Sequence, residues 1–455
     1  MPRRSQSDRM IKLDDGAAAV IRRLGEKGYK AYAVGGCVRD LLEGKTPHDY
    51  DIATSALPEE VIGVFDGETV VPTGLKHGTV TLVKDKIPYE ITTFRKDGDY
   101  ADGRRPESVE FVRDIESDLS RRDFTVNAMA YNDADGLIDP FGGERDIKNK
   151  ILRCVGDPDR RFDEDALRIL RLVRFCATLG FTADGRTAVA ADRKAGRLNA
   201  VSAERVFEEI DKLLQGDYAV GALLKFRRIM FAVIPELAPC DGFRQRTPWH
   251  RYDVYGHIAR SVGYARKDPA ERWCMLLHDV AKPDTFSFSD GKGHFYGHAR
   301  VSAEKCAEIF NRLKFPSALK KETLFLIENH GYPLKNDERA IKRAMNKFGD
   351  KAFFKILDVH MADNLAQGTA LSENERKTVE QVRKTALRII GRGDCYSLKT
   401  LGIGGEDLVK IGFKGEEVGE TLNKLLRDVI DGRLPNNRDA LYGKSVDMYE
   451  RKTRA

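Results

Sequence analysis

Two aspartates near the start of the chain are spaced for binding metal ions. Asp49 and Asp51 lie two residues apart in HDYDIAT, whose alternation is typical of a β-strand, so both carboxylates project from one face. Paired carboxylate oxygens suit hard divalent cations such as Mg²⁺, which also bind substrate phosphates. Glu90, in the strand-like segment YEITTF, has the same alternation and is a weaker third ligand. The pattern predicts phosphoryl transfer with two metal ions, one activating an attacking hydroxyl and one neutralising the leaving pyrophosphate.

A glycine pair stands shortly before these aspartates. In VGGCVRD an apolar strand runs into Gly35 and Gly36, and a helix is expected to begin near Val38. Glycine lets backbone N–H groups approach an anion, and a helix N-terminus adds a partial positive charge. Arg39 is placed to pair with a phosphate or with Asp40. Two aspartates alone can be solvated strand-end residues, and a glycine pair alone is usually a tight turn, but their succession predicts a triphosphate site.

A third constellation lies in RFDEDALRILRLVRF, a segment with helical periodicity. Asp165 and Arg168 are three residues apart, which places them on one face of a single helix. A carboxylate beside a guanidinium matches cytosine and adenine, which present an exocyclic amine next to ring acceptors. Guanine and uracil would leave the carboxylate unpaired, at a cost of ~1–3 kcal/mol. An ordinary intrahelical ion pair explains the same spacing when the helix is considered alone.

Seven of the nine histidines lie between residues 250 and 360. Imidazoles and carboxylates in this region could close around one or two divalent metal ions and generate a hydroxide for phosphoester hydrolysis. The alternative is a helical RNA-binding body without catalysis, and we expect His294 and His360 to lie outside the ligand set. The order of six residues here resembles the H…HD…H…H…D order of the HD phosphohydrolases, and that resemblance implies that the ligands are His257, His278, Asp279, His298, His330 and Asp363.

The elements that must position these residues fall into two parts. Residues 1–140 mix helix and strand signals, whereas amphipathic helices dominate from residue 141 onward. We therefore expect an α+β fold, with a mixed sheet and helices in the head followed by an all-α body. The segment 161–181 is expected to form one helix ended by Gly180, and Ser202 is expected to cap the helix that follows it. Strands are expected at 31–34, 48–54, 79–83 and 89–94.

Composition excludes several classes of protein. The chain has 455 residues and a formal net charge of +6, and no apolar run reaches the ~18–20 residues of a membrane span. Seven scattered cysteines without a CxxC pair indicate reduced thiols and a cytoplasmic protein. The charge is unevenly spread: residues 1–140 hold 20 Lys+Arg and 26 Asp+Glu, and the remainder holds 57 and 45. A basic body suits a polyanionic partner.

Six motifs occur in an order that resembles the head of the class II tRNA nucleotidyltransferases, the CCA-adding enzymes, and of the related bacterial poly(A) polymerases. The motifs are VGGCVRDLL, HDYDIAT, TGLKHGTV, YEITTFR, LSRRDFTVNAMAY and IDPFGG. The resemblance implies a polymerase-β-like head in which Asp49 and Asp51 bind catalytic Mg²⁺. It also implies that the incoming nucleotide is bound by Gly35, Gly36, Arg39, Arg121, Arg122, Asp123, Asp165, Arg168, Arg171 and Arg174. The histidine-rich part resembles an HD module, which implies phosphatase or cyclic phosphodiesterase action with Ni²⁺ or Mn²⁺.

The resemblance implies an enzyme that adds CCA to tRNA 3′ ends from CTP and ATP without a template. TGLKHGTV and the intact loop 95–109 favour complete CCA addition over poly(A) synthesis or addition of A alone. A rival of another class is an HD phosphohydrolase whose head only positions RNA, and a third is a non-catalytic RNA-binding chaperone. The expected domains are a head (1–140), a nucleotide-selecting and RNA-binding neck (141–240), an HD-type domain (241–370) and a tRNA-binding tail (371–455).

Overall fold

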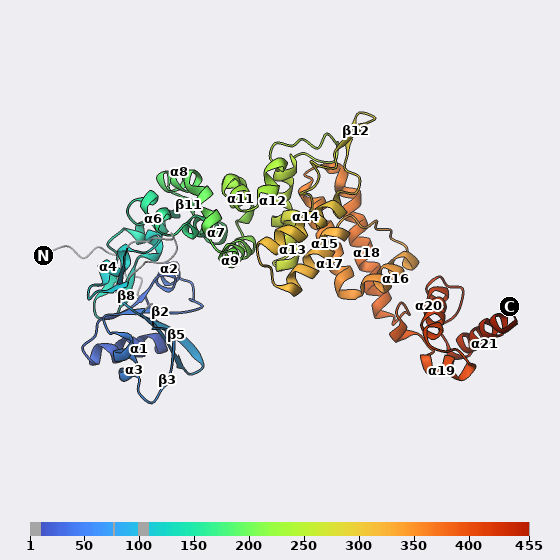
Figure 1. Cartoon of the computed structure of the whole chain (residues 1–455), viewed down its shortest axis with the longest axis horizontal. Helices are drawn as coiled ribbons and strands as arrows, with labels where there is room; N and C mark the ends of the chain where they lie inside the picture. The colour runs from blue at the N-terminus through green and yellow to red at the C-terminus, as the bar shows by residue number, and fades with distance from the viewer. Residues whose placement is uncertain (1–10, 76–77, 99–108, 455) are drawn as a thin grey trace. The chain divides into compact units, whose positions relative to one another are not determined.

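The computed structural model describes residues 11–75, 78–98 and 109–454 (Figure 1). The chain divides into two compact units, residues 1–238 and 239–455, and each is described by itself. The described residues contain no helix that is both long and apolar enough to cross a membrane.

A seven-stranded mixed sheet forms the centre of the head. Its order is β3-β4-β5-β2-β1-β8-β9, and β2 and β5 run parallel while the other neighbours are antiparallel. The parallel pair sets Asp51 opposite Glu90, so two of the expected metal ligands share one line across the sheet. The strands are β1 (Ala31–Val34), β2 (Asp51–Thr54), β3 (Thr69–Gly74), β4 (Thr79–Lys84), β5 (Ile87–Thr93), β8 (Ala130–Asn132) and β9 (Gly136–Ile138).

Short helices and a second small sheet complete the head. One core cluster packs Tyr32, Phe94 and Leu119 together, joining β1, the end of β5 and α4. The small sheet pairs β6 (Arg95–Asp97) with β7 (Val109–Phe111). The helices are α1 (Asp15–Glu26), α2 (Gly36–Leu42), α3 (Pro58–Val64), α4 (Ile115–Ser120), the 3₁₀ turn η2 (Thr125–Asn127) and α5 (Gly143–Lys148).

The neck is helical, with one two-stranded parallel sheet of β10 (Ile151–Leu152) and β11 (Thr182–Ala183). The expectation of one helix over 161–181 is wrong, because α6 ends at Glu164 and α7 begins at Leu167. Gly180 does end α7, in the left-handed conformation. The neck elements are α6 (Pro158–Glu164), α7 (Leu167–Leu179), α8 (Gly185–Lys194), η3 (Ala195–Ala200), α9 (Ala203–Leu214), α10 (Ala219–Lys225), α11 (Arg227–Val233) and η4 (Pro235–Cys240), which runs into the second unit.

The second unit is built from helices and one small hairpin. Trp273 is fully buried and its ring lies 4.6 Å from that of Phe315, centroid to centroid. The hairpin joins β12 (Ser287–Ser289) to β13 (Lys292–His294). The helices are α12 (Val254–Tyr264), α13 (Pro269–Leu277), α14 (His298–Arg312), α15 (Ser317–Asn329), α16 (Glu338–Phe348), α17 (Asp350–Ala366), η5 (Ala370–Ser372), α18 (Glu373–Gly391), η6 (Leu398–Thr400), α19 (Gly405–Ile411), α20 (Glu416–Ile430) and α21 (Arg438–Arg454).

Two further boundaries differ from the sequence expectation. The strand expected over 48–54 begins only at Asp51, so Asp49 and Tyr50 precede it. The helix expected from Val38 begins two residues earlier, at Gly36.

Candidate functional site

Head and neck together line a pocket of about 510 Å³. All the residues that the sequence assigns to nucleotide or metal binding in this unit line it, except Glu90. They are Gly35, Gly36, Arg39, Asp49, Asp51, Arg121, Arg122, Asp123, Asp165, Arg168, Arg171 and Arg174. Residues from separate sequence motifs therefore meet in one place.

Two carboxylates, those of Asp49 and Asp51, line this pocket, and Glu90 lies next to Asp51 in the sheet. Asp51 is the first residue of β2 and lies opposite Glu90, while Asp49 stands just before the strand. Desolvation by the surrounding protein raises the pKa of Asp51 to about 6, Arg122 opposes the rise, and Asp49 and Glu90 add to it. Like charges held this close disfavour ionisation unless a cation compensates them. The oxygen donor set fits a hard divalent ion.

The glycine turn beside the carboxylates has a conformation that only glycine adopts readily. Gly35 has φ 79° and ψ −130°, and its N–H donates to the carbonyl oxygen of Met129 at 3.3 Å. A Cβ at this position would lie 3.0 Å from Nη1 of Arg122. Arg39 pairs with Asp40 at 2.7 Å and also donates to Oδ1 of Asn127 at 2.7 Å. The turn is therefore packed directly against the cationic side of the pocket.

A buried aspartate orients the two arginines of the RRD motif. Asp118 is 1% exposed and pairs with Arg121 at 2.7 Å and with Arg122 at 3.2 Å. Burial opposes ionisation of Asp118, but the two guanidinium groups hold its pKa below the ordinary value. The third residue of the motif, Asp123, acts on the neck instead. Its carboxylate pairs with Arg171 at 2.6 Å.

The prediction that Asp165 and Arg168 lie on one face of a single helix is wrong. Asp165 follows α6 in an extended conformation, and Arg168 lies in the first turn of α7. Arg168 is 8% exposed and donates to Glu164 at 2.7 Å and to the carbonyl oxygen of Arg121 at 3.0 Å. Asp165 pairs instead with Arg205 of α9 at 2.8 Å. Both residues line the pocket, and Arg168 ties the neck to the head.

Helix α9 carries two residues that sequence reasoning missed, Arg205, which lines the pocket, and Glu209. Glu209 is 6% exposed and pairs with Arg174 at 2.6 Å, and Arg174 also lies over the ring of Phe175, 4.0 Å from its centroid. The sequence contained a pattern that could have identified them, because Arg205 and Glu209 are four residues apart and therefore share a helix face. Ser202 occupies the N-cap position of α9, but its side chain makes no capping hydrogen bond, contrary to the expectation.

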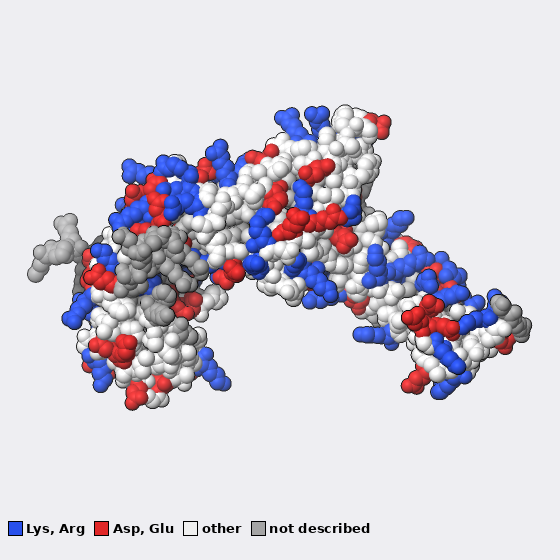
Figure 2. All heavy atoms as spheres, viewed as in Figure 1, with Lys and Arg blue, Asp and Glu red and all other residues white. Residues whose placement is uncertain are grey.

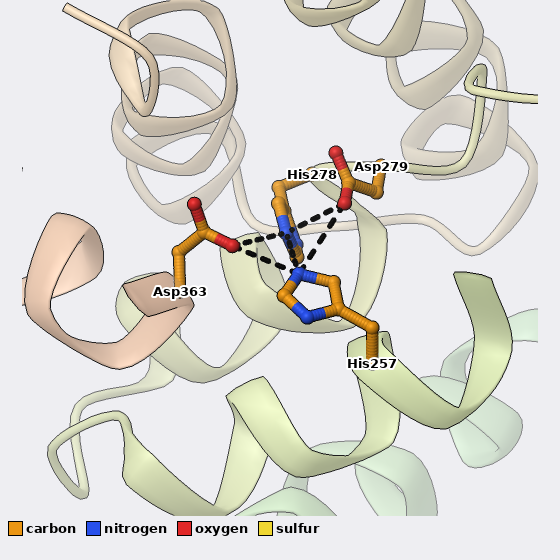
Figure 3. Close-up of side chains that lie close together, drawn as sticks. All are labelled: His257, His278, Asp279 and Asp363. Atoms are coloured by element: carbon orange, nitrogen blue, oxygen red, sulfur yellow. Dashed lines mark hydrogen bonds and ion pairs between the residues drawn. The ribbon is translucent and has the colours of Figure 1, made fainter. Parts of the chain in front are cut away.

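The six histidines and aspartates predicted as metal ligands converge in the second unit. Ligand atoms of His257, His278, Asp279 and Asp363 lie within 4.8 Å of one another, and those of Asp279, His298 and His330 form a second such group. Figure 3 shows the first four side chains pointing toward one another. These residues come from five helices or their ends: α12, α13, α14, α15 and α17. His294 and His360 belong to neither group.

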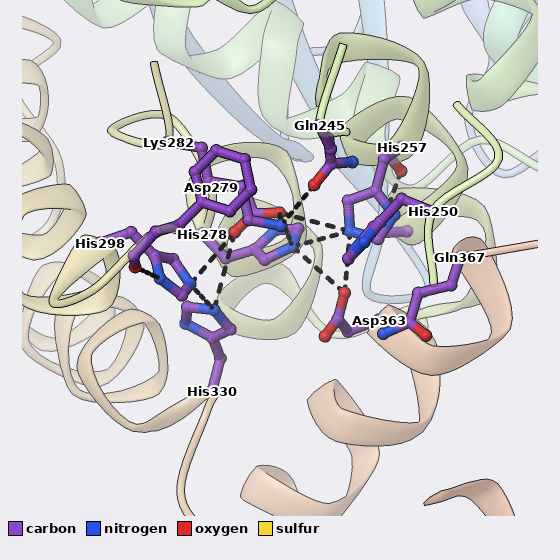
Figure 4. Close-up of polar contacts among 12 residues, drawn as sticks. Gln245, His250, His257, His278, Asp279, Lys282, His298, His330, Asp363 and Gln367 are labelled. Atoms are coloured by element: carbon purple, nitrogen blue, oxygen red, sulfur yellow. Dashed lines mark hydrogen bonds and ion pairs between the residues drawn. The ribbon is translucent and has the colours of Figure 1, made fainter. Parts of the chain in front are cut away.

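Charge coupling within this cluster is strong. His257 Nε2 lies 2.8 Å from Asp363 Oδ1. Burial lowers the pKa of His278, but Asp279 and Asp363 outweigh it and raise that pKa to about 10. Lys282, which sequence reasoning missed, pairs with Asp279 at 2.7 Å (Figure 4). A set of imidazoles and carboxylates that shares protons in this way fits a divalent transition metal.

Family models match three stretches of the chain. Residues 31–153 match the poly A polymerase head domain, 180–240 the probable RNA and SrmB-binding site of polymerase A, and 295–444 a putative second domain of tRNA nucleotidyltransferase. With the mixed sheet and the carboxylate-bearing pocket, these matches define a nucleotidyltransferase of the polymerase type. The α+β fold class predicted from the sequence is confirmed.

Curated relatives narrow the class. The CCA-adding enzyme of Geobacillus sp. WCH70 is 33% identical over 432 residues, which cover 94% of this chain and 95% of that protein. The alignment with the Geobacillus thermodenitrificans enzyme is 44% identical but spans 64% of its length. The crystal structure of the Bacillus stearothermophilus CCA-adding enzyme in complex with CTP is similar, with a TM-score of 0.70 and 29% identity over 96% of this chain and 98% of that one. The chain belongs to the family of CCA-adding enzymes, as the motifs indicated.

Proposed function

We propose that the head and neck pocket adds CCA to tRNA 3′ ends from CTP and ATP without a nucleic-acid template. The observation that carries this proposal is the convergence, in one pocket, of the carboxylates, the glycine turn, the arginines and Asp165. The names of the relatives favour CCA addition over poly(A) synthesis or addition of A alone. Most of the loop 95–109 lies outside the described residues, so that argument stays a prediction.

We assign Asp49 and Asp51 to a divalent ion, Mg²⁺ by preference, with Glu90 as a weaker ligand. A bound ion supplies charge neutralisation of the triphosphate and a lower pKa for the attacking hydroxyl. The tRNA 3′-hydroxyl oxygen forms a bond to the α-phosphorus while the bond to pyrophosphate breaks. The turn at Gly35 and Gly36, with Arg39, lies where backbone N–H groups can approach the phosphates.

Base selection falls to the neck. The Asp165 carboxylate accepts from the exocyclic amine of cytosine or adenine, and Arg205 holds that carboxylate in place. A carbonyl presented by guanine or uracil in the same position leaves Asp165 without a donor, at a cost of ~1–3 kcal/mol. Arg168 supports this geometry through its bonds to Glu164 and the backbone, with Arg171 and Arg174 beside it in the pocket.

The rest of the chain supports RNA binding. Figure 2 shows Lys and Arg side chains around α8 and over the C-terminal helices, with Asp and Glu side chains among them. Exposed arginines near α8 include Arg186, Arg193 and Arg197, of which Arg193 pairs with Asp159 and Arg197 with Asp163. Basic surface of this kind attracts a polyanion such as tRNA.

We propose the same division of the chain as the sequence predicts: head (1–140), neck (141–240), HD-type domain (241–370) and tail (371–455). Seven cysteines, all free and buried, support a cytoplasmic location.

The test is incorporation into tRNA that lacks CCA. The double variant Asp49→Ala/Asp51→Ala should lose incorporation of CTP and ATP while its circular dichroism spectrum is retained. Asp66→Ala, an exposed aspartate of the head, is the matched control and should keep full activity. Residual activity in the double variant contradicts the metal assignment. If the wild-type protein extends a non-tRNA RNA as well as it extends tRNA lacking CCA, poly(A) synthesis is favoured instead.

A second activity is favoured by the histidine and aspartate cluster. We propose that it holds a divalent metal ion, such as Ni²⁺ or Mn²⁺, and hydrolyses phosphoesters at RNA ends. Water adds to phosphorus, and the leaving oxygen departs with the proton as an alcohol. Opening of an RNA 2′,3′-cyclic phosphate to a phosphomonoester, and release of inorganic phosphate from an RNA with a terminal phosphomonoester, should both disappear in Asp279→Ala while CCA addition is retained. Hydrolysis that survives in Asp279→Ala would mean that another site is responsible.

A further inference from the structure

Three arginines of the pocket between head and neck converge on one aromatic ring. The guanidinium carbon of Arg174 lies 4.0 Å from the ring centroid of Phe175, and those of Arg171 and Arg39 lie 5.3 Å and 5.6 Å from it. Arg39 comes from α2 of the head, whereas the other three residues come from α7 of the neck. All four line the pocket. Each guanidinium is within the ~6 Å at which an aromatic ring attracts a cation.

The ring itself is held in place by a second phenylalanine. Phe175 is 6% exposed, and its ring meets that of Phe124 edge-on, with 5.8 Å between centroids and 88° between planes. Phe124 is completely buried and follows Asp123 of the RRD motif, to which its backbone N–H donates at 2.8 Å. The head therefore supports the ring that the neck helix carries.

The ring and the carboxylates contact different parts of these arginines. Arg171 pairs with Asp123 at 2.6 Å, and Arg174 pairs with Glu209 at 2.6 Å. A carboxylate binds the N–H groups at the edge of a guanidinium, as a phosphate does. An aromatic ring attracts the cation without accepting from those N–H groups along the edge. The contact with Phe175 thus restrains the arginines and consumes none of the donors that a phosphate requires.

Burial makes this contact stronger than it would be at the surface. The side chains of Arg39, Arg174 and Arg171 are 10%, 16% and 33% exposed, and the attraction between a cation and a ring increases when water is excluded. Positive charges held close together repel one another, and the negative face of a ring lowers that cost. Phe175 is therefore suited to keep three cations together where a polyphosphate must bind.

We propose that Phe175 is a positioning residue, whose ring holds Arg39, Arg171 and Arg174 in place to bind the triphosphate of the incoming nucleotide. The inference rests on the nucleotide addition proposed for this pocket and names the residue that organises its cationic side. The ring acts on groups that bind phosphate, so its effect is the same for CTP and for ATP.

The variant Phe175→Leu removes the ring and keeps an apolar side chain. Isothermal titration calorimetry in EDTA should show the Kd for CTP and the Kd for inorganic tripolyphosphate each rising about tenfold. Tripolyphosphate has no base, so an equal rise in both Kd values locates the loss at the phosphates. With tRNA lacking CCA, the KM values for CTP and for ATP should rise by the same factor while kcat stays within about threefold.

Two further variants separate positioning from a general structural role. Phe181→Leu is the matched control, because Phe181 follows the end of the same helix and is 3% exposed but does not line the pocket. It should lower the thermal unfolding temperature as Phe175→Leu does and leave both Kd values unchanged. Phe175→Tyr retains the ring and should bind both ligands within about twofold of wild type.

The outcomes separate this inference from the activity on which it rests. Unchanged Kd values in Phe175→Leu, a loss confined to kcat, or an equal loss of binding in Phe175→Tyr or Phe181→Leu overturns the role of the ring. The binding measurements need no turnover. A higher Kd for tripolyphosphate in Phe175→Leu alone supports the role of the ring even where the protein incorporates neither nucleotide, and in that case only the proposed activity fails.

Discussion

Replacement of Gly35 by alanine tests the geometry of the glycine turn. The backbone at this position lies in a region that is essentially restricted to glycine, where another residue costs ~1–3 kcal/mol. The added Cβ would also lie 3.0 Å from Nη1 of Arg122, closer than ordinary van der Waals contact. We therefore expect a total cost near the upper end of that range, about 2–3 kcal/mol.

This strain can lower either stability or activity. If the turn keeps its shape, the strain lowers the free energy of unfolding of the head. If the turn shifts, Arg122 and the backbone N–H groups move away from the triphosphate, and kcat/KM falls. One tenfold change corresponds to about 1.4 kcal/mol, so a loss carried wholly by catalysis is about 30- to 150-fold. Urea unfolding and single-nucleotide incorporation of CTP into tRNA lacking CCA measure the two effects.

The control variant Gly44→Ala measures the effect of backbone strain at a glycine that lies outside the pocket. Gly44 also has a positive φ of 73°, but nothing lies within 4 Å of a Cβ there, and it does not line the pocket. It should lose about 1 kcal/mol of stability and keep its kcat/KM. The reasoning is refuted by a Gly35→Ala enzyme with wild-type stability and activity, or by equal loss of activity in Gly44→Ala.

Three further outcomes are expected. Asp279 and Asp363 raise the pKa of His278 to about 10 and so keep it protonated at neutral pH. Ni²⁺ binding at pH 7.5 should therefore release about one proton, and the affinity for Ni²⁺ should increase as the pH rises towards 10. Titration calorimetry in two buffers of different ionisation enthalpy measures the proton release, and proton release that persists in His278→Ala contradicts the assignment. Glu209→Gln should lose about 2–4 kcal/mol in urea unfolding, since Glu209 is buried against Arg174, whereas the exposed neighbour Glu208→Gln should change little; equal losses would remove the special role of Glu209. Asp253→Ala should cost about 1–2 kcal/mol, because Asp253 accepts from the Gly256 N–H at 2.8 Å, while Ser202→Ala, with no capping bond to lose, should stay within about 0.5 kcal/mol, both measured by thermal unfolding.

Local patterns predicted the elements that carry the head site. The short apolar run AYAV and the alternation in TVTLV predicted β1 and β4, and the glycine pair does open α2. Motif order also predicted which distant residues meet, as with His257 and Asp363, which are 106 positions apart in the chain and 2.8 Å apart in the fold. Such predictions succeed because the residue types required by phosphate and metal chemistry are few.

The break between α6 and α7 could not be predicted in the same way. Hydrophobic periodicity continues through the segment, so it indicates one helix. The structure ends the helix because the Asp165 side chain accepts from the Leu167 N–H at 3.0 Å and pairs with Arg205, 40 residues later. Tertiary pairing of this kind overrides a periodic pattern, and no local signal encodes it.

The joint at Asp165 has a consequence for exchanging parts between relatives. The carboxylate proposed to choose the base belongs to no helix, and a guanidinium from α9 holds it. Transplanting α6 and α7 alone from an enzyme of different preference would carry over the residue without its support. If Asp165 selects the base as proposed, a chimaera must include α9 as well as α6 and α7 to change which nucleotide is added.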